Sequence, residues 1–154
     1  MTNGRDRVRA NTAAEVNRRI EEEAQRRVTR FAGRTAPAIS RRIEELDAEW
    51  DMERYLEMNA SALALTGTLL GLFVNKKFLA IPCIVLPFLF QHSVQGWCPP
   101  IPILRRRGVR TRKEIDAEKY ALKALRGDFA DVAKTDISAG APGSGRQAWQ
   151  AATA

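Results

Sequence analysis

His92 and Cys98 are the two residues of this 154-residue chain whose types and spacing could support chemistry. An imidazole and a thiol this close in sequence could hold a metal ion, or the thiol could accept sulfane sulfur. A structural zinc site, however, takes four protein ligands and a catalytic one takes three. One chain falls short of either number, and only a homo-oligomer could complete such a site.

Two apolar runs must position these residues. No charged residue occurs between Met58 and Asn75 or between Phe78 and Leu104, and only Asn75-Lys76-Lys77 separates the runs. A helix needs about 20 apolar residues to cross the hydrocarbon core of a bilayer, and each run is near that length. The sequence therefore predicts a two-helix transmembrane hairpin over residues 58–97, with a turn at Asn75.

Two other arrangements fit the same runs. The hairpin could be the buried core of a soluble domain, although the remaining sequence is strongly polar and offers little to cover it. It could also be a monotopic hairpin that dips into one leaflet. The shortness of the runs favours the second arrangement, as do Pro82 and Pro87, each of which removes a backbone donor and tends to kink a helix.

Small residues recur along one face of the first run, and two of them form a G-x-x-x-G pattern. Such a face lets two helix backbones approach closely. We expect it to pack against the second helix of the same hairpin, and contact with another subunit is the alternative. The helix-packing residues are Ala60, Ala64, Gly67, Thr68 and Gly71.

The formal net charge of +7 is unevenly distributed. Residues 1–57 are neutral, and the excess of positive charge follows the second run. By the positive-inside rule this excess places both termini in the cytoplasm and the Asn75 turn outside.

A basic run beside a membrane helix attracts anionic lipid headgroups, and nucleic acid is the competing ligand. We favour lipid and expect no nucleic-acid partner, because the run adjoins the membrane and no aromatic platform accompanies it. The predicted juxtamembrane lipid-binding residues are Arg105, Arg106, Arg107, Arg110, Arg112 and Lys113.

Helices are predicted on both sides of the hairpin. Residues 1–37 contain a charged amphipathic helix that starts at a Thr12–Glu15 capping box, after a disordered Met1–Asn11. This helix could lie on the membrane, pair with a second copy, dock on a partner or remain solvated. Residues 38–57 are expected to form a cytoplasmic helix that continues into the membrane, because no breaker lies between Ser40 and Val74.

The chain after the hairpin falls into three parts. Residues 98–113 form a proline-rich and basic juxtamembrane segment, in which the prolines exclude a regular helix. An amphipathic helix follows over residues 114–129. Residues 130–154 are rich in Ala, Gly, Ser and Thr, which is typical of a disordered tail. The predicted fold class is therefore all-α.

Gly96-Trp97-Cys98-Pro99 and the later Gly108-Val-Arg-Thr111 resemble the end of the YgaP-like inner-membrane transmembrane domain. The resemblance covers roughly residues 50–112. It implies a bacterial inner-membrane hairpin of two helices, often self-associating, with no activity assigned to the domain itself. Some relatives carry a rhodanese domain that moves sulfane sulfur. We expect no such domain here, because the N-terminal part is a charged helix without a catalytic cysteine. We therefore do not extend the resemblance to sulfur chemistry.

The sequence offers no phosphate-binding loop, nucleophile elbow or paired catalytic carboxylates. We therefore expect a non-enzymatic protein without a cofactor, one that acts as an accessory, assembly or scaffold subunit in a homo-oligomer or a larger membrane complex. The alternative is a thiol- or metal-dependent membrane protein that uses Cys98 and His92.

Overall fold

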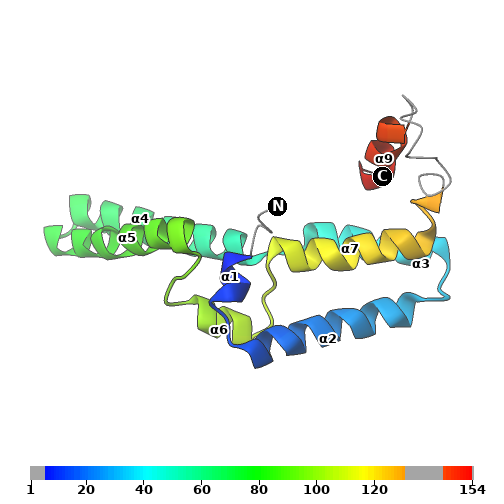
Figure 1. The fold of residues 1–154 in the computed structure, drawn as a ribbon. Coiled ribbons are helices and arrows are strands. Elements are labelled where there is room, and N and C mark those ends of the chain that lie inside the picture. Colours follow the sequence, from blue (N-terminus) through cyan, green and yellow to red (C-terminus); the bar gives the residue numbers. More distant parts are fainter. Residues whose placement is uncertain (1–5, 131–143, 154) are drawn as a thin grey trace. The chain divides into compact units, whose positions relative to one another are not determined.

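The computed structural model describes residues 6–130 and 144–153, and these residues form helices and no strand (Figure 1). The predicted all-α class is confirmed. The helices are α1 (Arg7–Ala10), α2 (Ala14–Phe31), α3 (Ala36–Ala48), α4 (Met52–Phe73), the 3₁₀ helix η1 (Lys76–Leu79), α5 (Ala80–Gln95), α6 (Ile101–Arg106), α7 (Arg112–Arg126) and α9 (Ser144–Thr153).

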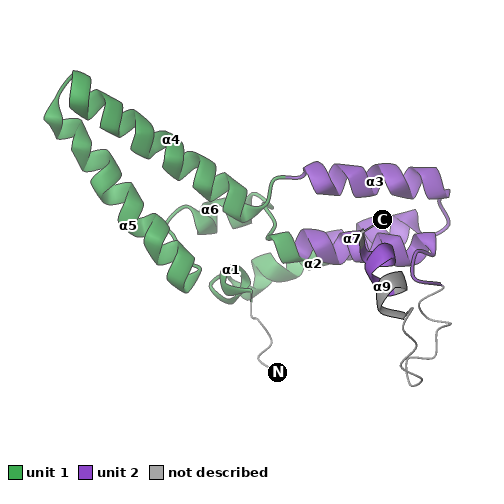
Figure 2. Cartoon of the chain, turned by 90° about the horizontal axis from the view of Figure 1, so that it is seen from above, with its two compact units in different colours: residues 1–21, 50–113 green, residues 22–49, 114–154 purple. Residues whose placement is uncertain are grey.

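The chain divides into two compact units (Figure 2). Unit 1 comprises residues 1–21 and 50–113 and contains the hairpin. Unit 2 comprises residues 22–49 and 114–154. Each unit is held together by side chains from segments far apart in the sequence.

Helices α4 and α5 lie side by side and form the predicted hairpin (Figure 1). The Asn75 side chain accepts a hydrogen bond from the Lys77 N–H at 2.9 Å and so starts η1, which confirms the turn. Two candidate spans are long and apolar enough to cross a membrane: Ala36–Phe73, which includes both α3 and α4, and Lys76–Gln95. Only 17% and 6% of their most apolar windows are buried, whereas the core helix of a soluble protein is mostly buried.

The small face of α4 packs against α5, as expected. Gly67 and Gly71 are buried. A Cβ added at Gly67 would lie 2.7 Å from Ile81 Cβ, and one added at Gly71 would lie 2.5 Å from a Leu79 methyl carbon. The G-x-x-x-G pattern therefore serves the contact within the hairpin. Ala60, Ala64 and Thr68, on the same side of α4, are half-buried.

The two prolines of α5 have different effects. Pro82 lies in the first turn of the helix, where the N–H that proline lacks would have no helical partner. Pro87 lies inside the helix and removes one backbone hydrogen bond there. Only one of the two expected interruptions of hydrogen bonding is therefore present.

The prediction of one continuous helix from residue 38 into the membrane is wrong. α3 ends at Ala48, and Glu49 is extended at φ −65° and ψ 133°. α4 begins anew because the Asp51 carboxylate accepts a hydrogen bond from the Arg54 N–H at 2.8 Å. The Met52 N–H donates to the Arg110 carbonyl at 2.8 Å instead of to a helical partner. Asp51 thus acts as an N-cap, a role that aspartate fills well, without any glycine or proline to mark the break.

Unit 1 has a small apolar core at the polar end of the hairpin. Val8 of α1, Met52 and Leu56 of α4, Cys98 between α5 and α6, and Ile101 of α6 are buried together there. Helix α6 corrects the expectation that the prolines exclude a helix. Pro100 is its N-cap residue and Pro102 lies in its first turn, and proline is tolerated at both places because the missing N–H would be unpaired.

Unit 2 has its own core, formed by α3, α7 and the end of α2. The buried residues are Ile39, Ile43, Leu46, Ile115 and Leu122, with Phe31 packed against them. Beside this core the fully buried Glu118 carboxylate accepts hydrogen bonds from the Arg27 and Arg42 guanidinium groups, each at 3.0 Å. A buried carboxylate needs such partners, since an unpaired charge in the interior is very costly.

The outcome at the two ends of the chain differs from the expectation. Residues 131–143 of the predicted disordered tail lie outside the described residues, but Ser144–Thr153 forms α9. The Ala152 carbonyl accepts a hydrogen bond from the buried Lys123 Nζ at 2.8 Å.

Near the other end, α2 starts at Ala14, and the Thr12 hydroxyl donates to the Val8 carbonyl at 2.7 Å instead of capping α2.

Replacing Gly67 by valine should separate α4 from α5. The new side chain would overlap Ile81 and Pro82, so we expect the free energy of unfolding to fall by about 1–3 kcal/mol. Thermal unfolding in detergent, followed by circular dichroism, measures this loss. Ala62→Val is the matched control, because Ala62 is exposed on the same helix and its change should leave the melting temperature within a degree or two. Equal melting temperatures for the two variants would contradict the described packing.

Candidate functional site

Cys98 lies in the core of unit 1 and is only 7% exposed. Its neighbours in that cluster include Val8, Met52 and Leu56. This burial raises the pKa of the Cys98 thiol, so the reactive thiolate is disfavoured. A buried, protonated thiol is poorly suited to accept sulfane sulfur. Within residues 6–130 and 144–153, no group of three metal-ligating side chains is found either.

Helix α1 caps the end of α5. The Arg7 guanidinium donates to the carbonyls of Ser93 at 2.7 Å and Val94 at 3.0 Å, and the Asn11 amide donates to the Gln95 carbonyl at 3.2 Å. These carbonyls have no partner within a helix that ends at Gln95. A cation at a helix C-terminus is also favoured by the helix dipole.

Gly96 makes this arrangement possible. It has a left-handed backbone, with φ +73°, and any Cβ there would collide with the Arg7 side chain. Residues 6–11 are therefore ordered by their contact with α5, and the expectation that Met1–Asn11 is disordered is wrong for them. Residues 1–5 lie outside the described part. The available signals were Asp6, whose carboxylate caps α1, and Gly96, a typical helix-ending residue.

The six predicted lipid-binding residues fall into two groups. Arg105 is fully buried and donates to Asn17 Oδ1 at 2.7 Å and to the Val109 carbonyl at 3.1 Å. Arg110 is 4% exposed. Both arginines are buried and are not accessible to a bilayer surface. The four exposed members of the set are Arg106, Arg107, Arg112 and Lys113.

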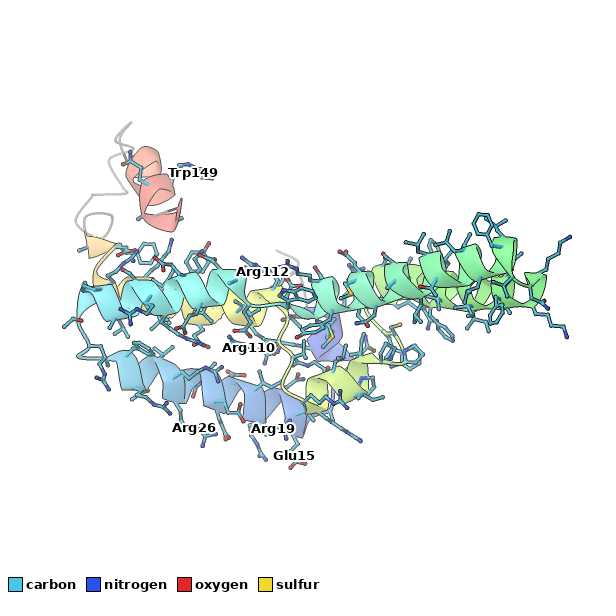
Figure 3. The ribbon with its side chains drawn as sticks, turned by 180° about the vertical axis from the view of Figure 1, so that it is seen from behind. Glu15, Arg19, Arg26, Arg110, Arg112 and Trp149 are labelled. Atoms are coloured by element: carbon cyan, nitrogen blue, oxygen red, sulfur yellow. The ribbon has the colours of Figure 1, made fainter. Side chains whose placement is uncertain are left out.

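Arg106 and Arg107 lie at the end of α6, and Arg112 and Lys113 begin α7, where Figure 3 labels Arg112. They belong to unit 1, as do the capped end of α5 and the start of α4. The structure thus gathers positive charge at the polar end of the apolar hairpin. Their binding to lipid stays a prediction.

A cavity of about 320 Å³ opens at this same end of the hairpin. Acidic, basic and apolar side chains all line it. Glu53 and Glu57 come from α4, His92 from α5, and Arg112 and Lys113 from the start of α7. His92 Nδ1 is buried without a hydrogen-bond partner among the described residues. The sequence did not reveal this cavity, because its lining comes from α1, from the two hairpin helices and from residues 111–113, which are far apart in the sequence.

Comparison with known proteins gives no further assignment. No protein-family model, curated protein or solved structure matches the chain. The resemblance to the YgaP-like transmembrane domain therefore stays a prediction.

Replacing both Arg106 and Arg107 by alanine should weaken binding to anionic lipid. Each exposed cation contributes about 1 kcal/mol at an anionic surface, so we expect about a thirtyfold loss of affinity for phosphatidylglycerol. Tryptophan fluorescence of the detergent-solubilised protein, titrated with phosphatidylglycerol and with phosphatidylcholine, measures this affinity.

Two controls make the result specific. Arg34→Ala with Arg41→Ala removes two exposed arginines of unit 2 and should leave the affinity unchanged. Arg105→Ala should instead lower the melting temperature, because it leaves Asn17 and the Val109 carbonyl without their donor. An unchanged affinity in the Arg106 and Arg107 variant would contradict the assignment of the basic segment to lipid.

Proposed function

We propose that the protein is an integral protein of the bacterial inner membrane, anchored by the α4–α5 hairpin, that acts without enzymatic activity as an accessory, assembly or scaffold subunit. The observation that carries this proposal is the exposed apolar outer surface of the hairpin. Large side chains on both helices are largely exposed, among them Leu65 at 62%, Leu72 at 67%, Phe73 at 81%, Ile84 at 59% and Phe90 at 72%.

This surface is unusual for a protein in water. A soluble monomer rarely exposes a contiguous apolar patch larger than a few hundred Å², whereas this hairpin is apolar on the faces that do not pack. Complete transfer of an exposed leucine or phenylalanine side chain out of water is worth about 1.5–3 kcal/mol, and these partly covered side chains gain a large share of that. A bilayer supplies that environment, and the helical backbone satisfies its own hydrogen bonds within lipid.

The distribution of charge supports the proposed orientation. The exposed cations of residues 106–113 and the α1 cap both belong to the polar end of the hairpin, opposite the Asn75 turn. The positive-inside rule then places this end, and with it both termini, in the cytoplasm. Lys76 and Lys77 in the turn are a weaker cluster on the outer side.

Unit 2 is the proposed partner-binding part. It closes its own core around Leu46, Ile115 and Leu122, so the hairpin is not needed to cover it. Tyr120 and Leu125 of α7 remain 46% and 44% exposed. Unit 2 is therefore a charged helical unit that is tethered to the membrane and exposes some apolar side chains. Such a surface can bind a second copy of the chain or another subunit.

The thiol- or metal-dependent alternative gains no support from the geometry. Cys98 is enclosed by apolar side chains, and its pKa is raised by burial. His92 instead lines the charged cavity. Cys98 does not line that cavity, although Val8 and Met52 contribute both to its lining and to the cluster around Cys98.

Purification of the tagged full-length chain in a mild detergent tests the scaffold role. We expect the purified complex to have a protein mass greater than the 17.2 kDa of one chain. The complex would be a homo-oligomer or would contain a second protein in fixed stoichiometry. Light scattering gives the protein mass, and an unrelated tagged membrane protein from the same cells is the control. A monomer without a reproducible partner would contradict the proposal.

A further inference from the structure

The cavity at the polar end of the hairpin carries an inference about its ligand, one that rests on the proposed membrane function. Its volume of about 320 Å³ lies at the lower end of the roughly 300–1,000 Å³ usual for small-molecule sites. All of its lining residues belong to unit 1. It is therefore a feature of a single compact unit.

The lining places charges of both signs around one space. Glu53 and Glu57 are four residues apart on α4, so both carboxylates lie on one face of that helix. Neither makes an ion pair or a side-chain hydrogen bond within the described residues. Two like charges at this spacing repel each other, and a bound cation would relieve that repulsion.

Positive charge faces the same space from other elements. Arg112 and Lys113 come from the start of α7 and Arg7 comes from α1. Together with Asp6, Glu53 and Glu57, the charged lining has no net charge. A ligand with one positive and one negative group matches this balance better than a simple anion or a simple cation does.

The position of the cavity narrows the ligand class further. Glu57 directly precedes the apolar run of α4, and Leu89 and Met52 add apolar lining. In a membrane-spanning hairpin this level is that of the lipid headgroups. His92 lines the same space, and its imidazole adds a polar group to the wall.

We propose that this cavity binds a phosphate ester that carries a primary ammonium group, as in the headgroup of phosphatidylethanolamine. The ammonium lies against Glu53 and Glu57. The phosphate lies toward Arg112 and Lys113, where the start of α7 adds the positive end of a helix dipole. The apolar lining accommodates the first part of the acyl chains.

Native mass spectrometry of the full chain in detergent tests this proposal with two lipids that have the same acyl chains. Phosphatidylethanolamine has three N–H donors, whereas phosphatidylcholine has none. Because a hydrogen bond to a charged group is strong, we expect about tenfold preference for phosphatidylethanolamine. Glu53→Gln with Glu57→Gln should reduce this preference to near unity, and both residues are exposed, so the fold should persist. The melting temperature of the double variant verifies that it does.

The matched control is Glu15→Gln with Glu44→Gln, which removes the same charge from exposed positions outside the cavity and should keep the preference. Soluble phosphoethanolamine, added as a competitor, distinguishes the source of the group. If millimolar phosphoethanolamine displaces the lipid from the unmodified chain but not from the Glu53 and Glu57 variant, the cavity recognises the same ammonium and phosphate groups. The natural ligand would then be a soluble phosphate ester and not the lipid.

Equal binding of the two lipids would overturn the inference, as would a preference that survives in the Glu53 and Glu57 variant. Either result could come from a chain that is firmly inserted in the membrane, which would leave the proposed function intact. A chain that stays soluble without detergent would instead overturn the proposed function itself.

Discussion

The packing of two apolar helices against each other, backbone to backbone, is the constraint on which the rest of the structure depends. Gly67 and Gly71 let α5 approach so closely that a methyl group at either position would overlap Ile81 or Leu79. In lipid there is no hydrophobic force between two helices, so close packing of small residues must supply their association. The large side chains are then left exposed on the outer faces, where the proposed membrane would supply lipid as their neighbour.

A helix pair of this kind must also end cleanly, because unpaired backbone groups are costly near a membrane. At each end of the hairpin, polar side chains form hydrogen bonds with these unpaired backbone groups. Asn75 starts the turn, Asp51 caps α4, and Arg7 with Asn11 covers the last carbonyls of α5. The polar end therefore becomes a small folded structure with its own core, and the charged cavity forms beside it.

The sequence was most informative where a pattern extended over many residues. The charge-free runs predicted the hairpin, and the spacing of Gly67 and Gly71 predicted its packing face. An amphipathic helix was also predicted over residues 114–129, because Ile115 and Leu122 recur at helical spacing. It corresponds to α7, and both residues lie in the core of unit 2.

The errors occurred where a few residues acted through distant partners. A four-residue helix such as α1 has no periodicity to recognise, and Arg7 and Asn11 donate hydrogen bonds to carbonyls more than 80 residues away. Arg105 resembled its exposed neighbours in sequence, but its partner Asn17 is 88 positions distant. Asp51 ended a helical pattern without a proline or glycine. The cavity was invisible for the same reason, since its lining comes from four separate segments.

The central claim, that lipid surrounds the hairpin and that the chain crosses the bilayer twice, is tested most directly by cysteine accessibility. One cysteine is placed at Asn75 in the turn and, in a separate variant, one at the exposed Ala32 between α2 and α3. A membrane-impermeant maleimide is then applied to intact spheroplasts and to inverted vesicles. We predict that the turn cysteine reacts only in spheroplasts and the Ala32 cysteine only in inverted vesicles. Reaction of both cysteines from the same side would contradict the account.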